Sequence, residues 1–237
     1  MKKELNLFIK NFKHLDRKIV TIFLSSIVIF TLSWYFANPN FFLTQFSFVD
    51  NYAQTSQDCF SFGYWFVADV FLFLIVPLLI TKFYFRENIK EYGINLKNKK
   101  IGFTYVFISI LFFLPIIIII SNSENFNEYF PLMQSAKSDL RIFIFYELFL
   151  LMFIFSWEFI LRGFLLFGLE KKFGFYSIFI QLIPFVLLHN GKPFIETFAS
   201  IAGGIFLGYL ALRTRSFFYG FLIHVIILIL LDILSLV

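Results

Sequence analysis

The residues best suited to carry out chemistry are an acid and a base inside an apolar segment. Glu158 and Arg162 stand four residues apart in the run 156–168, whose other side chains are almost all apolar. Residues four apart share one face of a helix, so the carboxylate and the guanidinium can pair. A charge at the centre of a bilayer costs about 2.5–3.5 kcal/mol and usually faces a bundle interior or a wet cavity. The pair therefore indicates either a functional site inside a membrane or an ion pair near a helix end, where Arg162 reaches the headgroups.

Two histidines follow this pair along the chain. His189 comes four residues after Phe185 and shares its helix face, and His224 lies in the last apolar segment. A carboxylate with two imidazoles in a membrane interior can take a proton from water and stabilise an oxyanion, which is what general-base hydrolysis requires. The same set could form a proton relay or a metal site. A single histidine is more often a hydrogen-bonding group between helices, so the interpretation depends on the co-occurrence of both with the Glu158–Arg162 pair.

The remaining candidates for chemistry are weaker. Glu196 and Asp232 lie near predicted outer ends of helices, where a carboxylate is expected to be solvated. We expect no cofactor and no tightly bound metal, because the chain has no His-x-x-x-His pair and Arg162 would oppose a divalent cation beside Glu158. The single Cys59 excludes an internal disulfide and a cysteine-cluster metal site.

Composition places these residues in a membrane. Hydrophobic residues make up 59% of the 237 residues, 40 residues are Phe, and charged residues make up 15%, against about 25% in an ordinary soluble domain. The apolar segments lack the strict alternation of a membrane β-barrel. The net charge of +5 comes from basic runs between apolar segments, which indicates membrane topology and gives no reason to expect nucleic-acid binding.

Seven apolar segments are long enough, or nearly so, to cross a bilayer as helices, which takes about 18 residues or more. The sequence predicts an all-α, polytopic transmembrane bundle of about seven to eight helices, in one integral membrane domain over 1–237. The predicted spans are 19–37, 63–81, 101–120, 140–169, 173–188, 195–212 and 217–237. Pro115 predicts a kink in the third span. Ser200, Gly204 and Gly208 predict close packing of the sixth span, because small residues four apart let membrane helices approach each other.

Charge between the spans predicts their orientation. Residues 1–18 form a basic lead that contains Lys2, Lys3, Lys10, Lys13, Arg17 and Lys18. The following run is too long for a signal-peptide core, so we expect a retained span. The loop 41–60 has no Lys or Arg and is rich in aromatic residues, as expected for the outer face, and a Gly-Lys-Pro sequence at 191–193 is expected to end the fifth span.

The order of these motifs resembles the CPBP membrane proteins, named for CAAX proteases and bacteriocin-processing enzymes and also called the Abi family. The family pattern is Glu-Glu-x-x-x-Arg, then Phe-x-x-x-His, then His-x-x-x-Asn/Asp on a late helix. Glu158 and Arg162 match the second glutamate and the arginine, Phe185 and His189 match the second motif, and His224 matches the histidine of the third. The resemblance covers 140–237, and the first half of the chain carries no motif of the family.

Two positions depart from the family pattern. Trp157 stands where the family has its first glutamate, the base that activates water, and Leu228 stands where the family has Asn or Asp. Asp232 comes eight residues after His224, which on a helix means about 80° of rotation and 12 Å of rise, so it does not replace the missing group.

The resemblance implies an intramembrane endopeptidase that hydrolyses a peptide bond with activated water. In that interpretation Glu158 is the base or acid, His189 is its partner, His224 is an oxyanion donor, and Arg162 keeps the carboxylate ionised. The expected partners are the lipid bilayer and a peptide or membrane-protein substrate, with the protein in the cell membrane and no nucleic acid involved.

Two other classes of function remain open at this point. One is a non-catalytic relative that acts in bacteriocin self-immunity or in membrane-protein assembly. The other is a proton-coupled transporter, which is disfavoured because the spans show no inverted repeat.

The distribution of basic residues yields a testable topology. Basic clusters precede the first span and follow the second, fourth and sixth, so we expect a cytoplasmic N terminus and Val237 on the opposite side of the membrane. Reporter enzymes fused after Val237, one active only in the cytoplasm and one active only outside it, measure this directly. Activity of the cytoplasmic reporter alone would contradict the seven-span topology.

Overall fold

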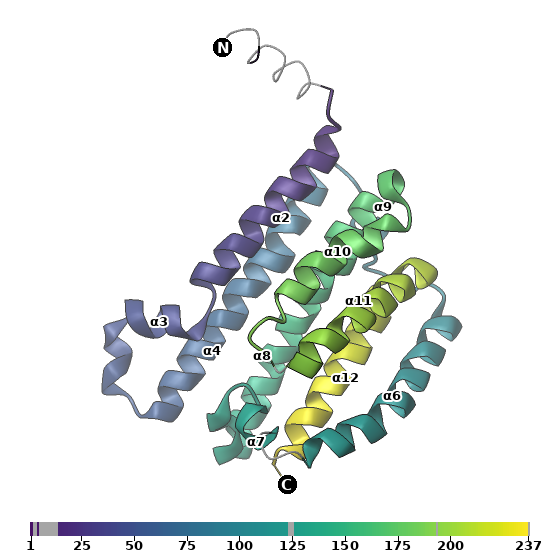
Figure 1. The fold of residues 1–237 in the computed structure, drawn as a ribbon. Helices are drawn as coiled ribbons and strands as arrows, with labels where there is room; N and C mark the ends of the chain where they lie inside the picture. Colours follow the sequence, from purple (N-terminus) through teal and green to yellow (C-terminus); the bar gives the residue numbers. More distant parts are fainter. Residues whose placement is uncertain (2–3, 5–13, 123–125, 193, 237) are drawn as a thin grey trace.

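A computed structural model of the chain describes residues 1, 4, 14–122, 126–192 and 194–236 (Figure 1). Within these residues every regular element is a helix, which confirms the all-α prediction. Most of the basic lead lies outside the described residues, as do Pro193 and Val237; the lysines concerned are Lys2, Lys3, Lys10 and Lys13.

All seven predicted apolar segments form helices. Five helical stretches in the described part of the chain are long and apolar enough to cross a membrane, which makes the protein a multi-pass membrane protein. They are α2 (Arg17–Phe36), α4 with its continuation (Gln54–Tyr84), α6 (Lys99–Ser121), α8 with its continuation (Leu140–Phe173) and α11 (Phe194–Thr214). Two shorter apolar helices, α10 (Tyr176–Leu187) and α12 (Phe218–Leu234), complete the set. The twelve residues of α10 rise only about 18 Å, so this helix is shorter than a bilayer core.

The second helix is longer than the sequence predicted, because the expected outer loop 41–60 is itself largely helical. Helix α3 (Pro39–Gln45) occupies its first part, a 3₁₀ turn follows at Ser47–Asn51, and α4 begins at Gln54. Asn38 starts α3: its side-chain oxygen accepts a hydrogen bond from the Phe41 amide at 2.8 Å, and Pro39 occupies the first helical turn. The short α7 (Phe126–Tyr129) and a 3₁₀ turn at Gln134–Ser138 lie between α6 and α8.

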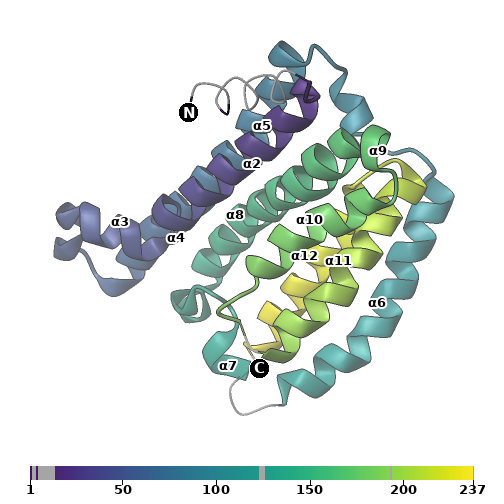
Figure 2. The same ribbon diagram turned by 45° about the horizontal axis from the view of Figure 1, so that its top comes forward.

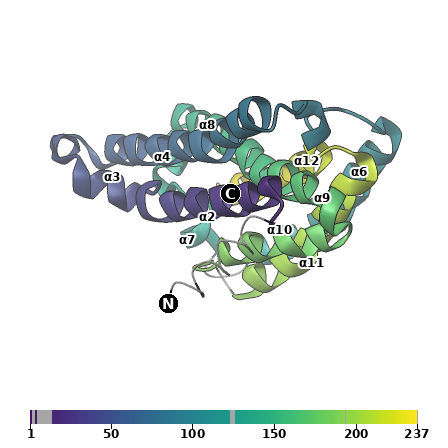
Figure 3. The same cartoon turned by 90° about the horizontal axis from the view of Figure 1, so that it is seen from above.

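Helix α8 is central in the bundle. Helix α4 packs against it on one side, and α12 packs against it on another, while α6 packs on α12 and α10 packs on α11. Figure 2 shows α10 and α11 in front of α12, with α6 on the outer side, and Figure 3 shows α3 with the adjoining ends of α2 and α4 projecting to one side. Helix α6 bends in its second half, the half that contains Pro115 (Figure 1). The start of α2 and the end of α12 lie at opposite ends of the bundle, as an odd number of crossings requires.

The loops that carry the basic clusters meet at the end of the bundle where α2 begins. Lys18 pairs with Glu87 at 2.6 Å, and Arg215 pairs with Glu170 at 2.6 Å. Burial raises the pKa of Glu87, but hydrogen bonds from Lys18 and from the Tyr92 hydroxyl outweigh it and leave this pKa lowered. The loops after α4, after α8 and before α12 therefore form one face, which we call the basic end.

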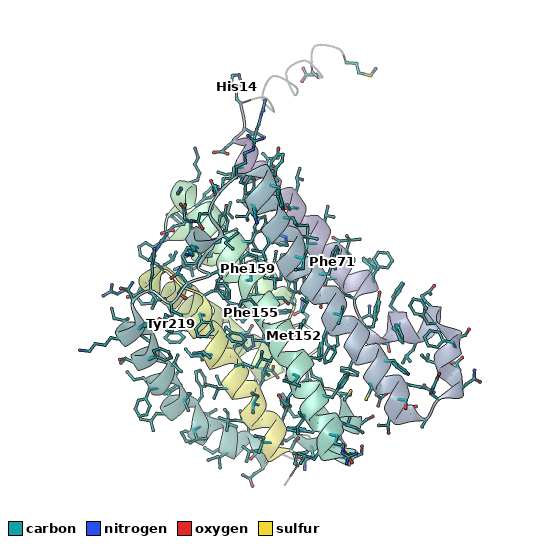
Figure 4. The ribbon with its side chains drawn as sticks, turned by 180° about the vertical axis from the view of Figure 1, so that it is seen from behind. His14, Phe71, Met152, Phe155, Phe159 and Tyr219 are labelled. Carbon is teal, nitrogen blue, oxygen red and sulfur yellow. The ribbon has the colours of Figure 1, made fainter. Side chains whose placement is uncertain are left out.

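Aromatic side chains fill the space between α8 and its neighbours. The Phe155 ring packs edge-on against Phe217 and Phe221, and the Phe159 ring lies 5.8 Å from Phe217. Figure 4 shows Phe155 and Phe159 along the central helix and Tyr219 at the junction of α12 with α6. These contacts hold α8 against the start of α12.

Helices α10 and α11 approach each other closely, as the small residues of α11 predicted. A methyl group at Gly204 would lie 2.5 Å from Leu182 and 2.7 Å from the Phe185 ring. The Gln181 amide donates to the Gly204 carbonyl at 3.0 Å across the same contact. Gly204 thus leaves the space that the Phe185 ring occupies.

Adjacent glycines on α11 provide a matched test of this packing. We expect Gly204→Ala to lower the free energy of unfolding by about 1–3 kcal/mol, because the added methyl group overpacks the contact with α10. Gly203→Ala should leave stability unchanged or raise it by up to about 1 kcal/mol, because no atom lies within 4 Å of its added methyl group and alanine favours a helix. Unfolding of both variants in detergent micelles measures the difference; equal stabilities would contradict it.

Candidate active site

The motif that carries Glu158 lies where the central helix changes its winding. Helix α8 ends at Glu158, the next nine residues, Phe159–Phe167, form a π-helix, and α9 (Gly168–Phe173) continues to the basic end. π-Helical turns are rare and frequently occur at functional sites. Gly163 fits this segment because a methyl group there would lie 2.5 Å from the Phe159 ring and 3.1 Å from the Tyr92 carbonyl oxygen. A regular α-helix was expected here from the sequence, because apolar periodicity does not distinguish a short π-helical stretch from an α-helix.

Glu158 is at the centre of a buried group of three ionisable side chains. Arg162 donates from Nη1 to Glu158 Oε1 at 3.0 Å, and His224 Nδ1 lies 2.9 Å from the same oxygen. Glu158 and Arg162 are both fully buried, and His224 is half-buried. Of the two alternatives that the sequence left open, the structure shows an ion pair in the bundle interior and no extension of Arg162 to the headgroups.

The guanidinium of Arg162 is held by a second element. Its central carbon lies 4.1 Å above the ring of Phe185 on α10, a cation–π contact. Within the described residues, Nε and Nη2 of Arg162 find no hydrogen-bond partner. Helix α10 therefore contributes an aromatic face to the charge cluster as well as the backbone that carries His189.

His189 lies on the turn after α10 and is oriented by its own helix. Its Nδ1 lies 2.6 Å from the Phe185 carbonyl oxygen, and its ring packs edge-on against the Phe185 ring at 4.5 Å. The Trp157 ring lies 6.0 Å away. The side chain is almost fully buried. The sequence interpretation made His189 the partner of Glu158, whereas in the structure the hydrogen bond of Glu158 is with His224.

The two histidines border the same space, a cavity of about 790 Å³ that we call the central cavity. Its wall includes Trp65, Asp69, Trp157, His189, His224 and Leu228, and it extends to polar residues at the end of the bundle opposite the basic end. Glu158 is not part of this wall: it lies behind His224, which separates it from the cavity.

Both positions that depart from the family pattern lie in the wall of the central cavity. Trp157 packs edge-on against Phe73 of the α4 continuation at 6.0 Å, and its ring is tilted against Phe153 at 5.6 Å. Its indole nitrogen, a hydrogen-bond donor, has no acceptor among the described residues. Leu228 lies one turn beyond His224. The wall is therefore apolar at the two places where the family pattern has polar groups.

The two weaker candidates lie outside this site. Glu196 pairs with Lys192 at 2.5 Å, and both side chains are partly exposed, as expected near a helix end. The expectation of a solvated Asp232 was wrong: this residue is 1% exposed, because α8 covers the end of α12, where Tyr146 lies beside it. Asp232 is absent from the cavity wall, in agreement with the helical geometry that separates it from His224.

One residue of the cavity wall escaped the sequence analysis. Asp69 lies within the second apolar segment, on α4, and is 2% exposed. An acid in the middle of a predicted span was a usable signal, because such groups are rare and usually functional. It was overlooked because no motif surrounds it.

Fold and site together define a polytopic membrane helix bundle that buries a carboxylate–imidazole pair next to a cavity. Residues 139–230 match the Rce1-like family, which is described as type II CAAX prenyl endopeptidase Rce1-like. This match confirms the resemblance to the CPBP proteins, and it covers the chain from the start of α8 into α12. Comparison of the chain with curated proteins and with solved structures gave no match.

Arg162 should matter for stability far more than an exposed arginine does. We expect Arg162→Met to lower the free energy of unfolding by about 3–5 kcal/mol, because it leaves the Glu158 carboxylate buried with one donor fewer. The same change at the exposed Arg213 should alter it by less than about 0.5 kcal/mol. Adding Glu158→Leu to Arg162→Met should recover part of the loss, because the unpaired charge is then removed. Equal unfolding energies for the Arg162 and Arg213 variants would contradict a structural ion pair.

Proposed function

We propose that the protein is an intramembrane peptidase in the cell membrane, with a peptide or membrane protein as substrate and its N terminus in the cytoplasm. The observation that supports this most strongly is the hydrogen bond between Glu158 and His224, with His224 and His189 on the wall of one cavity. The family match over 139–230 agrees with CAAX-type peptidase chemistry.

In this mechanism His224 is the general base. Its Nδ1 contacts a carboxylate, which accepts hydrogen bonds, so Nδ1 carries the proton and Nε2 keeps a free lone pair. The ring borders the cavity, so Nε2 can take a proton from a water molecule there. The water oxygen then attacks the peptide carbonyl, the C–N bond breaks, and His224 returns the proton to the leaving nitrogen.

Glu158 and Arg162 act behind His224. The carboxylate fixes the tautomer and the orientation of the imidazole, and it stabilises the imidazolium that forms when His224 accepts the proton. Arg162 pairs with the carboxylate at 3.0 Å and balances its charge inside the bundle. Glu158 is then a positioning residue, because His224 stands between it and the cavity.

His189 and Trp157 complete the proposed site. The Nδ1 of His189 is directed at the Phe185 carbonyl oxygen, which can only accept, so in the neutral ring Nε2 can accept a hydrogen bond from the attacking water. The indole N–H of Trp157 has no acceptor in the described part of the chain and its nitrogen is buried, so it reaches the carbonyl oxygen of the substrate only if the ring turns toward the cavity. Together these groups orient the water and polarise the peptide bond.

Turnover of a quenched fluorescent peptide library by the purified protein in liposomes tests this function. Glu158→Gln should reduce kcat by about 10²–10⁴-fold, because the amide can present its NH₂ group to His224 and favour the wrong tautomer. Glu196→Gln is the matched control: this acid pairs with a lysine near a helix end and should retain turnover. A folded Glu158→Gln variant with full turnover would contradict the assignment.

The apolar side chains at Trp157 and Leu228 favour one other function, a non-catalytic relative that binds a membrane protein or peptide in the same cavity. The variant Trp157→Glu separates the two cases. A gain of peptidase activity over an inert wild type would identify a degenerate enzyme. If the wild type, Trp157→Glu and Glu158→Gln are all inert, the Glu158–Arg162 pair serves packing alone.

A further inference from the structure

A second carboxylate borders the central cavity from the opposite side, on a helix that the family match does not include. Asp69 of α4 is 2% exposed and accepts a hydrogen bond from the Trp65 indole nitrogen at 2.8 Å. Its other oxygen, Oδ1, has no hydrogen-bond donor among the described residues. Asp69 takes no part in the Glu158 cluster, so the proposed mechanism leaves it without a role.

Contacts between α4 and α8 place Asp69 at the depth of the proposed site. Trp65, one turn before Asp69, packs against Phe153 at 5.6 Å. Phe73, one turn after it, packs against Trp157 at 6.0 Å. Residues four apart share one helix face, so Asp69 lies on the face turned to α8, at the level between Phe153 and Trp157. Its carboxylate thus belongs to the wall opposite the histidines.

An ionised Asp69 would have no compensating cation within the described structure. The other acid of the cavity wall, Asp58, is hydrogen-bonded by Gln54 and Ser135 near the start of α4. The lysine of the wall, Lys192, pairs with Glu196. A carboxylate at membrane depth is costly unless a partner neutralises it, and the Trp65 indole and the Ser33 hydroxyl beside Asp69 are both neutral groups.

We propose that Asp69 is a specificity-determining residue that binds a lysine or arginine side chain of the peptide substrate. The inference rests on the proposed function, since it places a peptide in the same cavity. The cavity extends to polar residues at the end of the bundle opposite the basic end, so a cationic side chain can descend along it from water. The Trp65 indole donates to one oxygen and the Ser33 hydroxyl of α2 lies beside the carboxylate, so a rotation of the carboxylate about its Cβ–Cγ bond brings Oδ1 to the ligand.

The protein contains its own reporter for this binding. All three tryptophans of the chain, Trp34, Trp65 and Trp157, line the central cavity, and Trp65 donates to the carboxylate in question. Intrinsic fluorescence therefore detects occupancy of the cavity whether or not a peptide is cleaved.

The decisive measurement is fluorescence titration of the full-length protein in liposomes with two peptides. Both are leucine–alanine peptides with acetylated and amidated ends, and they differ only in one lysine or its neutral counterpart norleucine. We expect the wild type to bind the lysine peptide about 10- to 100-fold more tightly, the range for a hydrogen bond to a charged group. Equal affinities would overturn the proposal, and this comparison needs no variant that could misfold.

Two variants locate the effect. Asp69→Asn, which keeps the shape of the side chain, should bind both peptides equally, while Asp58→Asn should retain the preference, because other residues already satisfy Asp58. A preference that persists in Asp69→Asn would also overturn the proposal.

Cleavage of the same peptides separates this inference from the proposed function. A lysine preference in binding without any cleavage would reject the peptidase and leave the role of Asp69 standing. Cleavage without a lysine preference would support the peptidase and overturn the role of Asp69.

Discussion

The burial of the Glu158 carboxylate between Arg162 and His224 is the constraint on which the rest of the structure depends. A charge at this depth is tolerated only where donors surround it, and here one donor comes from the next turn and the other from α12. The arrangement requires that α8 and α12 come close. Gly220 of α12 faces this contact: a methyl group there would lie at van der Waals distance, 3.4 Å, from Glu158 Oε2. The aromatic contacts of Phe155 with Phe217 and Phe221 hold the same two helices together at the start of α12.

The position of His224 converts this structural pair into a potential catalytic one. Its ring contacts the Glu158 carboxylate on one side and borders the central cavity on the other. The carboxylate, which does not line the cavity, therefore acts on the imidazole that does. Phe185 has a comparable double role: its ring carries the Arg162 guanidinium, and its carbonyl oxygen orients His189. The close packing of α10 on α11 therefore fixes the position of Phe185, and with it the surroundings of Arg162 and His189, as well as stabilising the bundle.

The helical class, the approximate positions of the seven apolar segments and the pairing of Glu158 with Arg162 were predictable from the sequence. Each depends on local patterns: runs of apolar residues that match bilayer thickness, and a four-residue spacing that matches a helical turn. The small residues of α11 were likewise predictable as a contact surface, and Gly204 and Gly208 do lie against α10. The burial of Asp232 and the helical structure within 41–60 were not, because both depend on which neighbouring elements cover them.

The sequence by itself determined that this is a multi-pass helical membrane protein with one acid–base pair in its fourth apolar segment, because composition and periodicity are properties of the chain. It did not determine which histidine meets Glu158. That choice depends on the crossing of α8 with α12 and on the short α10, and no spacing along the chain records the distance between separate helices. Only the tertiary structure placed His224 beside the carboxylate, while His189 contacts the Phe185 carbonyl oxygen of its own helix, and only the tertiary structure brought Asp69 from α4 to the same cavity.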